Sequence, residues 1–317
     1  MAVARGAVTI IRAFNGSLAD AEGLLAVERA AFNESPYSPA DLRAMLTGGS
    51  QCGWLAVREG AAIGFAVAFL TAGLGGPCWE IDLLAVHPDW RRRGLATQLI
   101  RGAAAGGRGL AGRTRAAVAT GNVHSGRAFA RAGLRALPGT YRLLVYRDQG
   151  PQQRRPYPGD ILIEATQDLS VAAGWLTSLP DADLSRQQRP GQEQGELDPP
   201  GQAAPNGFTF LLARQNGRPA GYAELIEVQT ILYRGIWIER LAASNQAVSA
   251  VLIQAAIDRA AAGGLDEVGA MAPAANQALQ KALLAAGFSS AGDFHWFTAG
   301  LPLPELAEPF SPCHSGR

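Results

Sequence analysis

The sequence predicts an α/β fold made of two similar domains in tandem, each a mixed, twisted sheet flanked by helices. One observation is the length, because 317 residues suit two ordinary domains better than one. Another is an internal repeat, in which residues 82–85 (D-L-L-A) match residues 239–242 (E-R-L-A). The spacing of an Asn, an apolar residue and a Gly at 122, 129 and 133 also recurs at 276, 283 and 287.

Composition shifts mark the boundaries of these two domains. Residues 149–160 contain Pro, Gly and Gln in the proportions of a linker, which places the domains at 1–148 and 161–303. Residues 181–207 are rich in Pro, Gln and Gly and are expected to form a long loop inside the second domain. The tail at 304–317 is expected to be irregular.

The bulk composition indicates a globular protein and narrows the partners that we expect. Hydrophobic residues make up 48% of the chain and charged residues 17%, which allows an ample core. A net charge of +1 favours neither nucleic acid nor a membrane surface as partner. The three cysteines cannot all pair and lack metal-ligand spacing. Together with the absence of an apolar run of roughly 18 residues, this predicts a cytoplasmic protein without a bound metal.

Start and stop signals predict the elements of the first domain. Ser17 and Ser38 are helix caps, and Gly133 ends a helix. Residues 58–60 connect two apolar runs as a hairpin turn. The predicted strands are 8–14, 54–57, 62–71, 79–86, 114–119 and 141–146, and the predicted helices are 17–32, one from 39, one from 95, and 127–132.

The second domain repeats this order with fewer signals. Two strands surround the turn formed by Asn216 and Gly217, which is typical of a hairpin. The predicted strands are 208–213, 220–226, 236–243, 267–271 and 295–299, and the predicted helices are 248–262 and 277–286.

The stretch 79–100 has the pattern of a site for an anion. A strand ends before Pro88, three arginines and Gly94 form a tight turn, and a helix with Leu95 and Leu99 on its apolar face follows. The first turn of a helix has unpaired N–H groups and a partial positive charge. The sequence therefore predicts that this turn receives an anion such as a phosphate.

These residues resemble two motifs of the GCN5-related N-acetyltransferase (GNAT) superfamily. The string at 84–96, L-A-V-H-P-D-W-R-R-R-G-L-A, resembles motif A, and Asn122, Ser125, Phe129 and Gly133 fall at the spacing of motif B. The resemblance implies two GNAT-fold domains and acetyl-CoA as co-substrate. It implies a gap between the fourth and fifth strands that holds acetyl-CoA.

The resemblance also implies which residues contact acetyl-CoA. The backbone of the fourth strand is expected to pair with the pantetheine amides, the turn amides to hold the pyrophosphate, and the residues of motif B to lie beside the pantetheine arm. The expected cofactor-binding residues are Leu84, Ala85, Val86, Arg91, Arg92, Arg93, Gly94, Leu95, Ala96, Thr97, Asn122 and Phe129.

Acetyl transfer to an amine requires a base, because a lysine-like amine with a pKa of about 10.4 is protonated at neutral pH. Glu80 falls where histone-type members of the superfamily carry a basic glutamate, and Asp82 is the second candidate. Phe129 stands where motif B usually has a tyrosine that protonates the leaving thiolate. Either the thiolate leaves as such, or Tyr141 or a water molecule donates the proton.

The second domain lacks these features. Val248, Val251 and Ile253 align with Arg91, Gly94 and Ala96, and Trp237 aligns with Glu80. We therefore expect this domain to bind no acetyl-CoA and to pack on the first as an intramolecular pseudo-dimer, in a protein that is a monomer or a dimer. The sequence predicts an N-acetyltransferase whose acceptor is a primary amine of a small molecule or a protein. The alternative is a non-catalytic module that binds acyl-CoA or another protein.

Overall fold

The computed structural model describes residues 8–32, 35–49, 51–147, 157–179, 207–231, 233–301 and 303. Residues 149–156 of the predicted linker, 181–206 of the predicted loop and the predicted tail at 304–317 lie outside these ranges. The described elements confirm an α/β fold with a mixed sheet and helices on both of its faces.

The elements of the first half follow the predicted order closely. Ser38 forms a full capping box with Asp41 at the start of α2, and the hairpin turn between β2 and β3 has left-handed Glu59 and Gly60. In chain order the elements are β1 (Thr9–Ala13), α1 (Leu18–Phe32), α2 (Pro39–Thr47), β2 (Cys52–Arg58), β3 (Ala61–Thr71), β4 (Cys78–Val86), a 3-10 turn (Pro88–Trp90), α3 (Leu95–Gly106), β5 (Arg113–Ala119), α4 (Val123–Ala132), β6 (Arg135–Ala136) and β7 (Tyr141–Arg147).

The second half contains two elements that the sequence patterns did not predict, β8 and α5. The strand β8 has the sequence I-L-I-E-A-T, which lacks a clear alternation, and α5 is short. In chain order the elements are β8 (Ile161–Thr166), α5 (Leu169–Ser178), β9 (Phe208–Gln215), β10 (Arg218–Gln229), β11 (Arg234–Ala243), α6 (Gln246–Ala262), β12 (Glu267–Pro273), α7 (Gln277–Ala285) and β13 (Ser289–Gly300).

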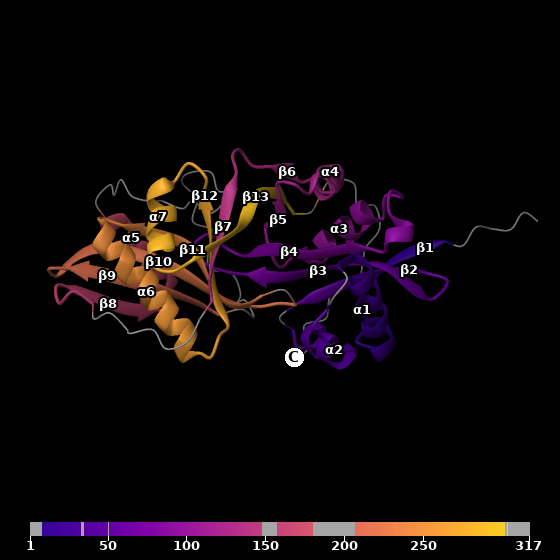
Figure 1. Cartoon of the computed structure of the whole chain (residues 1–317), viewed down its shortest axis with the longest axis horizontal. Coiled ribbons are helices and arrows are strands. Elements are labelled where there is room, and N and C mark those ends of the chain that lie inside the picture. The colour runs from indigo at the N-terminus through magenta and orange to yellow at the C-terminus, as the bar shows by residue number, and fades with distance from the viewer. Residues whose placement is uncertain are drawn as a thin grey trace, which may run out of the picture.

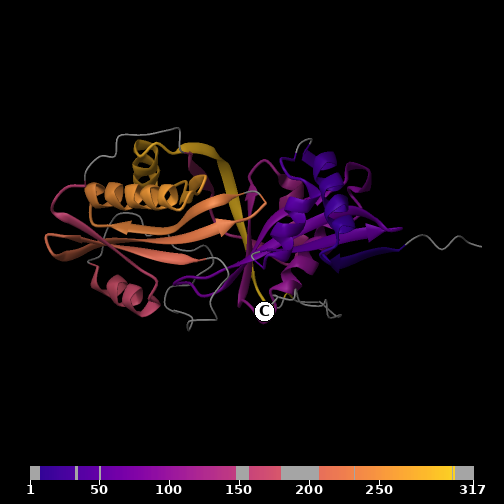
Figure 2. The ribbon, with the colours of Figure 1, turned by 90° about the horizontal axis from the view of Figure 1, so that it is seen from below.

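One continuous sheet runs through both halves in the order β1-β2-β3-β4-β5-β13-β7-β12-β11-β10-β9-β8, and β6 pairs with β13. Helices cover both faces of this sheet (Figures 1 and 2). In the first half, α3 and α4 pack on one face and α1 and α2 on the other. In the second half, α6 and α7 cover one face and α5 the opposite one.

The two halves exchange their final strands. The strand β7 pairs with β12, from Tyr141 opposite Pro273 to Arg147 opposite Glu267. In return, β13 pairs with β5, from Phe294 opposite Ala119 to Gly300 opposite Arg113. Figure 1 shows β13, in yellow, extending from the second half toward β5. The predicted domain limits follow the sequence repeat, whereas the strand pairing crosses them.

The same irregularity in both halves supports the repeat. In β4, Leu83 lies opposite Val67 and Ile81 opposite Ala68, so that Asp82 is the extra residue of a β-bulge. In β11, Arg240 lies opposite Glu224 and Ile238 opposite Leu225, which makes Glu239 the extra residue. Asp82 and Glu239 are therefore equivalent. Because of the bulge, Glu80 and Asp82 do not follow the regular alternation of an unbroken strand.

Each half inserts a hairpin tip into the other. Leu74, in the tip between β3 and β4, is 4% exposed and packs among apolar residues of α5, β9 and β10. Ile231, in the tip between β10 and β11, is 3% exposed and packs against α1 and α2. Two cores thus depend on a residue from the other half.

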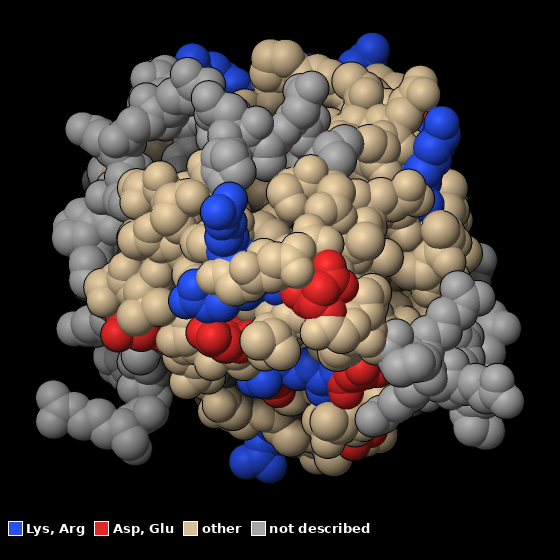
Figure 3. All heavy atoms as spheres, turned by 90° about the vertical axis from the view of Figure 1, so that its left-hand side faces the viewer, with Lys and Arg blue, Asp and Glu red and all other residues tan. Residues whose placement is uncertain are grey.

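The end of the molecule formed by the second half carries charges of both signs. Figure 3 shows its basic and acidic side chains lying beside one another on an otherwise uncharged surface. This mixture agrees with a net charge of +1 for the whole sequence. Among the residues that the structure describes, helices long and apolar enough to cross a membrane are absent.

Candidate functional site

The strands β4 and β5 separate partway along their length. They pair in parallel only from Cys78 opposite Arg113 to Glu80 opposite Arg115. Beyond that point β4 continues to Val86 and β5 to Ala119 without further pairing between them. The β5-facing edge of β4 from Asp82 onward thus lies outside the ladder and can receive an extended ligand.

The turn that follows β4 is shaped by two residues in the left-handed region. Arg92 has φ of 64° and Gly94 has φ of 79°. A side chain at Gly94 would meet nothing within 4 Å, so the glycine serves the backbone conformation rather than close packing. The turn leads directly into the first turn of α3, where backbone N–H groups are unpaired. Arg91 Nε donates to the Val86 carbonyl at 3.2 Å and ties the turn to the strand.

A cavity of about 780 Å³ lies where the separated end of β4 meets this turn. Most of the residues predicted to contact the cofactor line its wall, and they lie at the end of β4, in the turn and at the starts of α3 and α4. The predicted residues on the wall are Leu84, Ala85, Val86, Arg91, Arg92, Gly94, Leu95, Ala96, Thr97 and Asn122.

Five of the predicted site residues are not on this wall: Glu80 and Asp82 of β4, described below, and Phe129, Arg93 and Tyr141. Phe129 is 4% exposed and packs against Phe297 of β13, with 5.8 Å between the ring centroids. The Arg93 guanidinium lies over the Trp90 ring at 4.6 Å, outside the cavity wall. Tyr141 is paired with Pro273 in the second half, and burial raises its pKa. The strand exchange therefore carries Tyr141 to the second half.

The cavity wall also contains residues that the motifs did not indicate. They come from the end of α1, from the turn and from one face of α4, and they are Ala31, Phe32, Trp90, His124, Ser125, Arg127, Ala128 and Arg131. The spacing at 124, 127–128 and 131 is that of one helical face and could have identified the α4 residues. Arg127 and Arg131 add positive charge to this wall.

Asn122 has a structural role as well as a place on the wall. Its side-chain oxygen accepts a hydrogen bond from the Ser125 amide at 3.1 Å and caps α4. Asn276 caps α7 in the same way through Leu279. Capping alone thus explains why both halves have an asparagine here.

Glu80 is held in a buried ion-pair network between the halves. Arg115 Nε donates to both Glu80 oxygens, at 2.8 and 2.7 Å, and Thr71 donates to one of them at 2.8 Å. The same guanidinium binds Glu239 through two hydrogen bonds of 3.0 Å. Burial alone would lower the pKa of Arg115, but the two carboxylates raise it.

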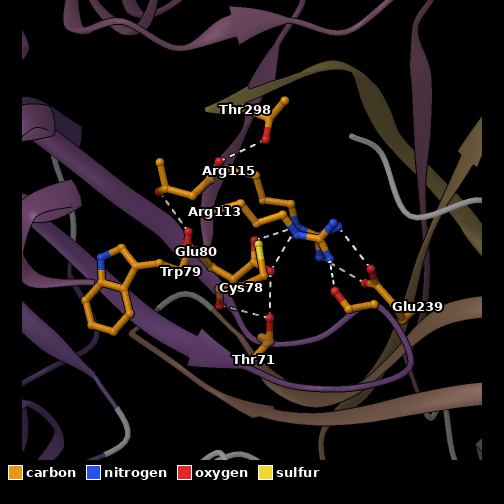
Figure 4. A network of polar contacts seen from close by, with 10 residues as sticks. Thr71, Cys78, Trp79, Glu80, Arg113, Arg115, Glu239 and Thr298 are labelled. Carbon is orange, nitrogen blue, oxygen red and sulfur yellow. Dashed lines mark hydrogen bonds and ion pairs between the residues drawn. The ribbon is translucent and has the colours of Figure 1, made fainter. Parts of the chain in front are cut away.

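Figure 4 shows the Arg115 guanidinium reaching across to Glu239 from the strand pair that carries Glu80. Its planar group also lies over the Trp296 ring at 4.4 Å. Glu80 is 6% exposed and is not part of the cavity wall. Both Glu80 oxygens thus already accept hydrogen bonds from Arg115, and one of them also from Thr71. These contacts disfavour Glu80 as the catalytic base.

Asp82 has a different environment although it is only two residues away. Its Oδ2 atom is buried and has no hydrogen-bond partner. Burial raises the pKa of Asp82 to about 6, a hydrogen bond from the Thr230 side chain opposes that rise, and the nearby Glu80 adds to it. A carboxyl group with this pKa can exchange a proton near neutral pH.

The acetyltransferase (GNAT) family model matches residues 22–134, which span α1 to α4 and include the separated strands, the turn and the cavity. These residues form a GNAT domain. No curated protein matches the chain in sequence.

Solved structures match nearly the whole chain at low identity. The chain is similar to a GCN5-related N-acetyltransferase from Sphaerobacter thermophilus, with 16% identity, a TM-score of 0.55, and coverage of 96% of this chain and 98% of that one. A tandem GNAT protein from the clavulanic acid biosynthesis pathway matches with 14% identity, a TM-score of 0.52, and coverage of 92% and 98%. At these identities the matches show a shared tandem GNAT fold.

The second half differs from the GNAT domain at the place of the turn. Ser244 and Asn245 alone connect β11 to α6, whereas residues 87–94 connect β4 to α3. Val248, Val251 and Ile253 are buried core residues inside α6. These residues lie in the predicted helix, which occupies the place that the turn has in the first half. Among the residues that the structure describes, no cluster of side chains suits a metal ion.

Proposed function

We propose that the protein transfers an acetyl group from acetyl-CoA to a primary amine and that the GNAT domain of the first half performs the reaction. The observation that supports this most directly is the cavity between the separated end of β4 and the left-handed turn before α3. Its wall combines an unpaired strand edge with a helix N-terminus, which suit the amides of a pantetheine arm and a pyrophosphate.

The cysteamine end of acetyl-CoA supplies a thioester as acyl donor, and the protein must supply a neutral amine. Deprotonating a lysine-like amine at neutral pH costs roughly 4–5 kcal/mol. A carboxylate near the acceptor lowers this cost by taking the proton. In this proposal Asp82 is the base, because its Oδ2 atom has no hydrogen-bond partner, while Glu80 is bound by Arg115 and Thr71.

The leaving thiolate needs no protein acid in this scheme. Phe129 cannot donate a proton, and Tyr141 lies against β12 of the second half. A thiol has a pKa of only about 8–9, so a thiolate is a tolerable leaving group. These placements fit departure of the CoA thiolate as such, or its protonation by water, better than its protonation by Tyr141.

The acceptor is expected to arrive as a cation. Glu28 of α1 is 4% exposed, and its Oε2 atom has no hydrogen-bond partner. It precedes Ala31 and Phe32, which line the cavity rim, by about one helical turn. Tyr37 lies within electrostatic range of Glu28, and Tyr37 donates to the carbonyl of Ile231 at 2.6 Å. A carboxylate in this position favours an ammonium group.

Calorimetry with acetyl-CoA and the Gly94→Trp variant tests the cofactor site. The large side chain at a left-handed position distorts the turn and fills the anion site, so binding is expected to be lost. Gly109→Trp is the matched control, because Gly109 is also left-handed, exposed and free of neighbours within 4 Å. Retained binding in Gly94→Trp, or equal loss in Gly109→Trp, contradicts the assignment.

Turnover separates the enzyme from the alternative of a non-catalytic acyl-CoA-binding module. Wild-type protein and Asp82→Asn are assayed for thiol release from acetyl-CoA with a panel of primary amines and amine-bearing peptides. The proposal predicts acceptor-dependent release that Asp82→Asn reduces strongly while calorimetric affinity stays the same. Tight acetyl-CoA binding with no acceptor-dependent release across the panel supports the non-catalytic module.

A further inference from the structure

The cavity extends along α4, beyond the strand end and the turn that suit the pantetheine arm and the pyrophosphate. Its wall there consists of His124, Arg127, Ala128 and Arg131. These positions have the three- and four-residue spacing of one helical face. At 1.5 Å per residue they extend over roughly 10 Å. The cavity therefore offers a second binding surface on α4, in addition to the edge of β4 and the turn.

Arg127 and Arg131 are the strong cations of this surface. Both are exposed, and among the residues that the structure describes neither guanidinium has an ion-pair or hydrogen-bond partner. Of the described residues that form the cavity wall, none is an aspartate or a glutamate. Two unpaired guanidinium groups in a wall without carboxylates favour a ligand that brings a further negative charge.

The sequence around these arginines is basic as well. Residues 91–147 contain twelve arginines and no aspartate or glutamate. Arg115, Arg142 and Arg147 of this segment pair with carboxylates from other strands. The net charge of the whole sequence is only +1, so the excess of positive charge is concentrated in the segment that forms the turn, α3 and α4.

The second half shows that a helix in this place does not need two arginines for its packing. Alignment on the capping asparagines of α4 and α7 makes Lys281 the counterpart of Arg127 and Ala285 the counterpart of Arg131. The second half also lacks the left-handed turn before its helix α6. The pair of arginines thus accompanies the anion-binding turn rather than the fold.

Coenzyme A has a group that suits this surface. Its ribose carries the pyrophosphate on the 5′ oxygen and a phosphate monoester on the 3′ oxygen, and such a monoester has a charge of about −2 at neutral pH. We propose that Arg127 and Arg131 bind the 3′-phosphate of the acyl donor. The inference rests on the proposed function, because it takes the pyrophosphate to lie at the turn before α3.

This contact selects the kind of donor. A guanidinium binds a phosphate through two parallel N–H bonds, which give direction as well as charge. A thioester on a protein-bound phosphopantetheine arm has the same pantetheine amides but no 3′-phosphate. The two arginines therefore favour a thioester of free coenzyme A over one on a carrier protein.

Arg131 also has a possible structural role that the test must separate from ligand binding. It lies in the last turn of α4, where a cation stabilises the helix through its dipole. Its carbonyl accepts a hydrogen bond from Arg101 of α3 at 3.0 Å. Two ligands that differ only in the 3′-phosphate make the separation, because a structural defect weakens the binding of both.

The test is calorimetry of acetyl-CoA and acetyl-3′-dephospho-CoA with wild-type protein and with a double variant that combines Arg127→Gln and Arg131→Gln. Wild type is expected to bind acetyl-CoA about tenfold more tightly, which is the value of one hydrogen bond between charged groups. In the double variant the two affinities should become equal. A double variant with Arg108→Gln and Arg135→Gln is the matched control, because both arginines are exposed and lie off the cavity wall. It loses the same charge and should keep the wild-type ratio.

The possible failures are distinguishable. Equal affinity of wild type for the two donors, or a wild-type ratio that survives in the Arg127 and Arg131 variant, overturns the inference and leaves the proposed function standing. A parallel loss for both donors beyond that of the control also overturns it. If wild type binds neither donor, the proposed acetyl-CoA site is wrong and the inference falls with it. If the double variant does not fold, Arg127→Gln alone should lower the ratio, and an unchanged ratio overturns the inference.

Discussion

Asp82→Asn should make the fold more stable at neutral pH although it removes the proposed base. Burial raises the pKa of Asp82 from 3.8 to about 6, so the folded protein binds this proton more tightly than the unfolded chain does. Each unit of pKa corresponds to about 1.4 kcal/mol, which gives a cost of ionisation in the folded state of about 3 kcal/mol. The cost is complete above about pH 6 and disappears as the pH falls toward 4. Asparagine never carries this charge and avoids the cost.

Urea unfolding of wild type and Asp82→Asn at two pH values measures this difference. Near pH 7.5 the variant should be more stable by up to about 3 kcal/mol, and near pH 4 the two proteins should unfold together. Asp89→Asn is the control, because the Asp89 side chain is 83% exposed. The reasoning is refuted if the variant is less stable at the higher pH, or if the gain in stability is the same at both values.

Three further changes probe other parts of the molecule. Arg115→Met leaves Glu80 and Glu239 buried without their cation, and urea unfolding should show a loss of about 3–5 kcal/mol; a loss close to zero contradicts this. Glu28→Gln should raise the acceptor KM by about tenfold, the value of one charge-assisted hydrogen bond, with acetyl-CoA affinity unchanged by calorimetry. Tyr141→Phe should leave kcat and its pH profile unchanged, and a lost alkaline limb would restore Tyr141 as an acid.

The architecture was largely predictable because its signals are local. The repeat of Asp82 and Glu239, the hairpin turns and the glycine turn are all encoded within a few residues, and the structure has them in the predicted places. The exchange of β7 and β13 was not predictable. Either strand satisfies the pattern for either half of the sheet, and the choice depends on pairing between segments about 150 residues apart in the chain, such as Arg142 and Asp293.

One part of the candidate site was predictable from the sequence and another part was not. The cavity wall from Leu84 to Thr97 was predictable, because a motif fixes a strand end, a turn and a helix start in sequence. The partners of Glu80 were not, because Arg115 lies 35 residues further along the chain and bridges to Glu239, which is 124 residues from Arg115. Choosing between Glu80 and Asp82 required this long-range ion pair, since both are carboxylates in the same strand.

The exchanged strands also set the order in which a newly made chain can become functional. The strand β5, which forms one side of the proposed active site, has β13 as its neighbour, and β13 ends at Gly300. A ribosome that has completed all of residues 1–148 has therefore made every residue of the cavity wall but not the strand that supports β5. The first half must wait, partly assembled, until the segment at 289–300 emerges. Truncations in that segment should consequently inactivate a site that lies far upstream in the sequence.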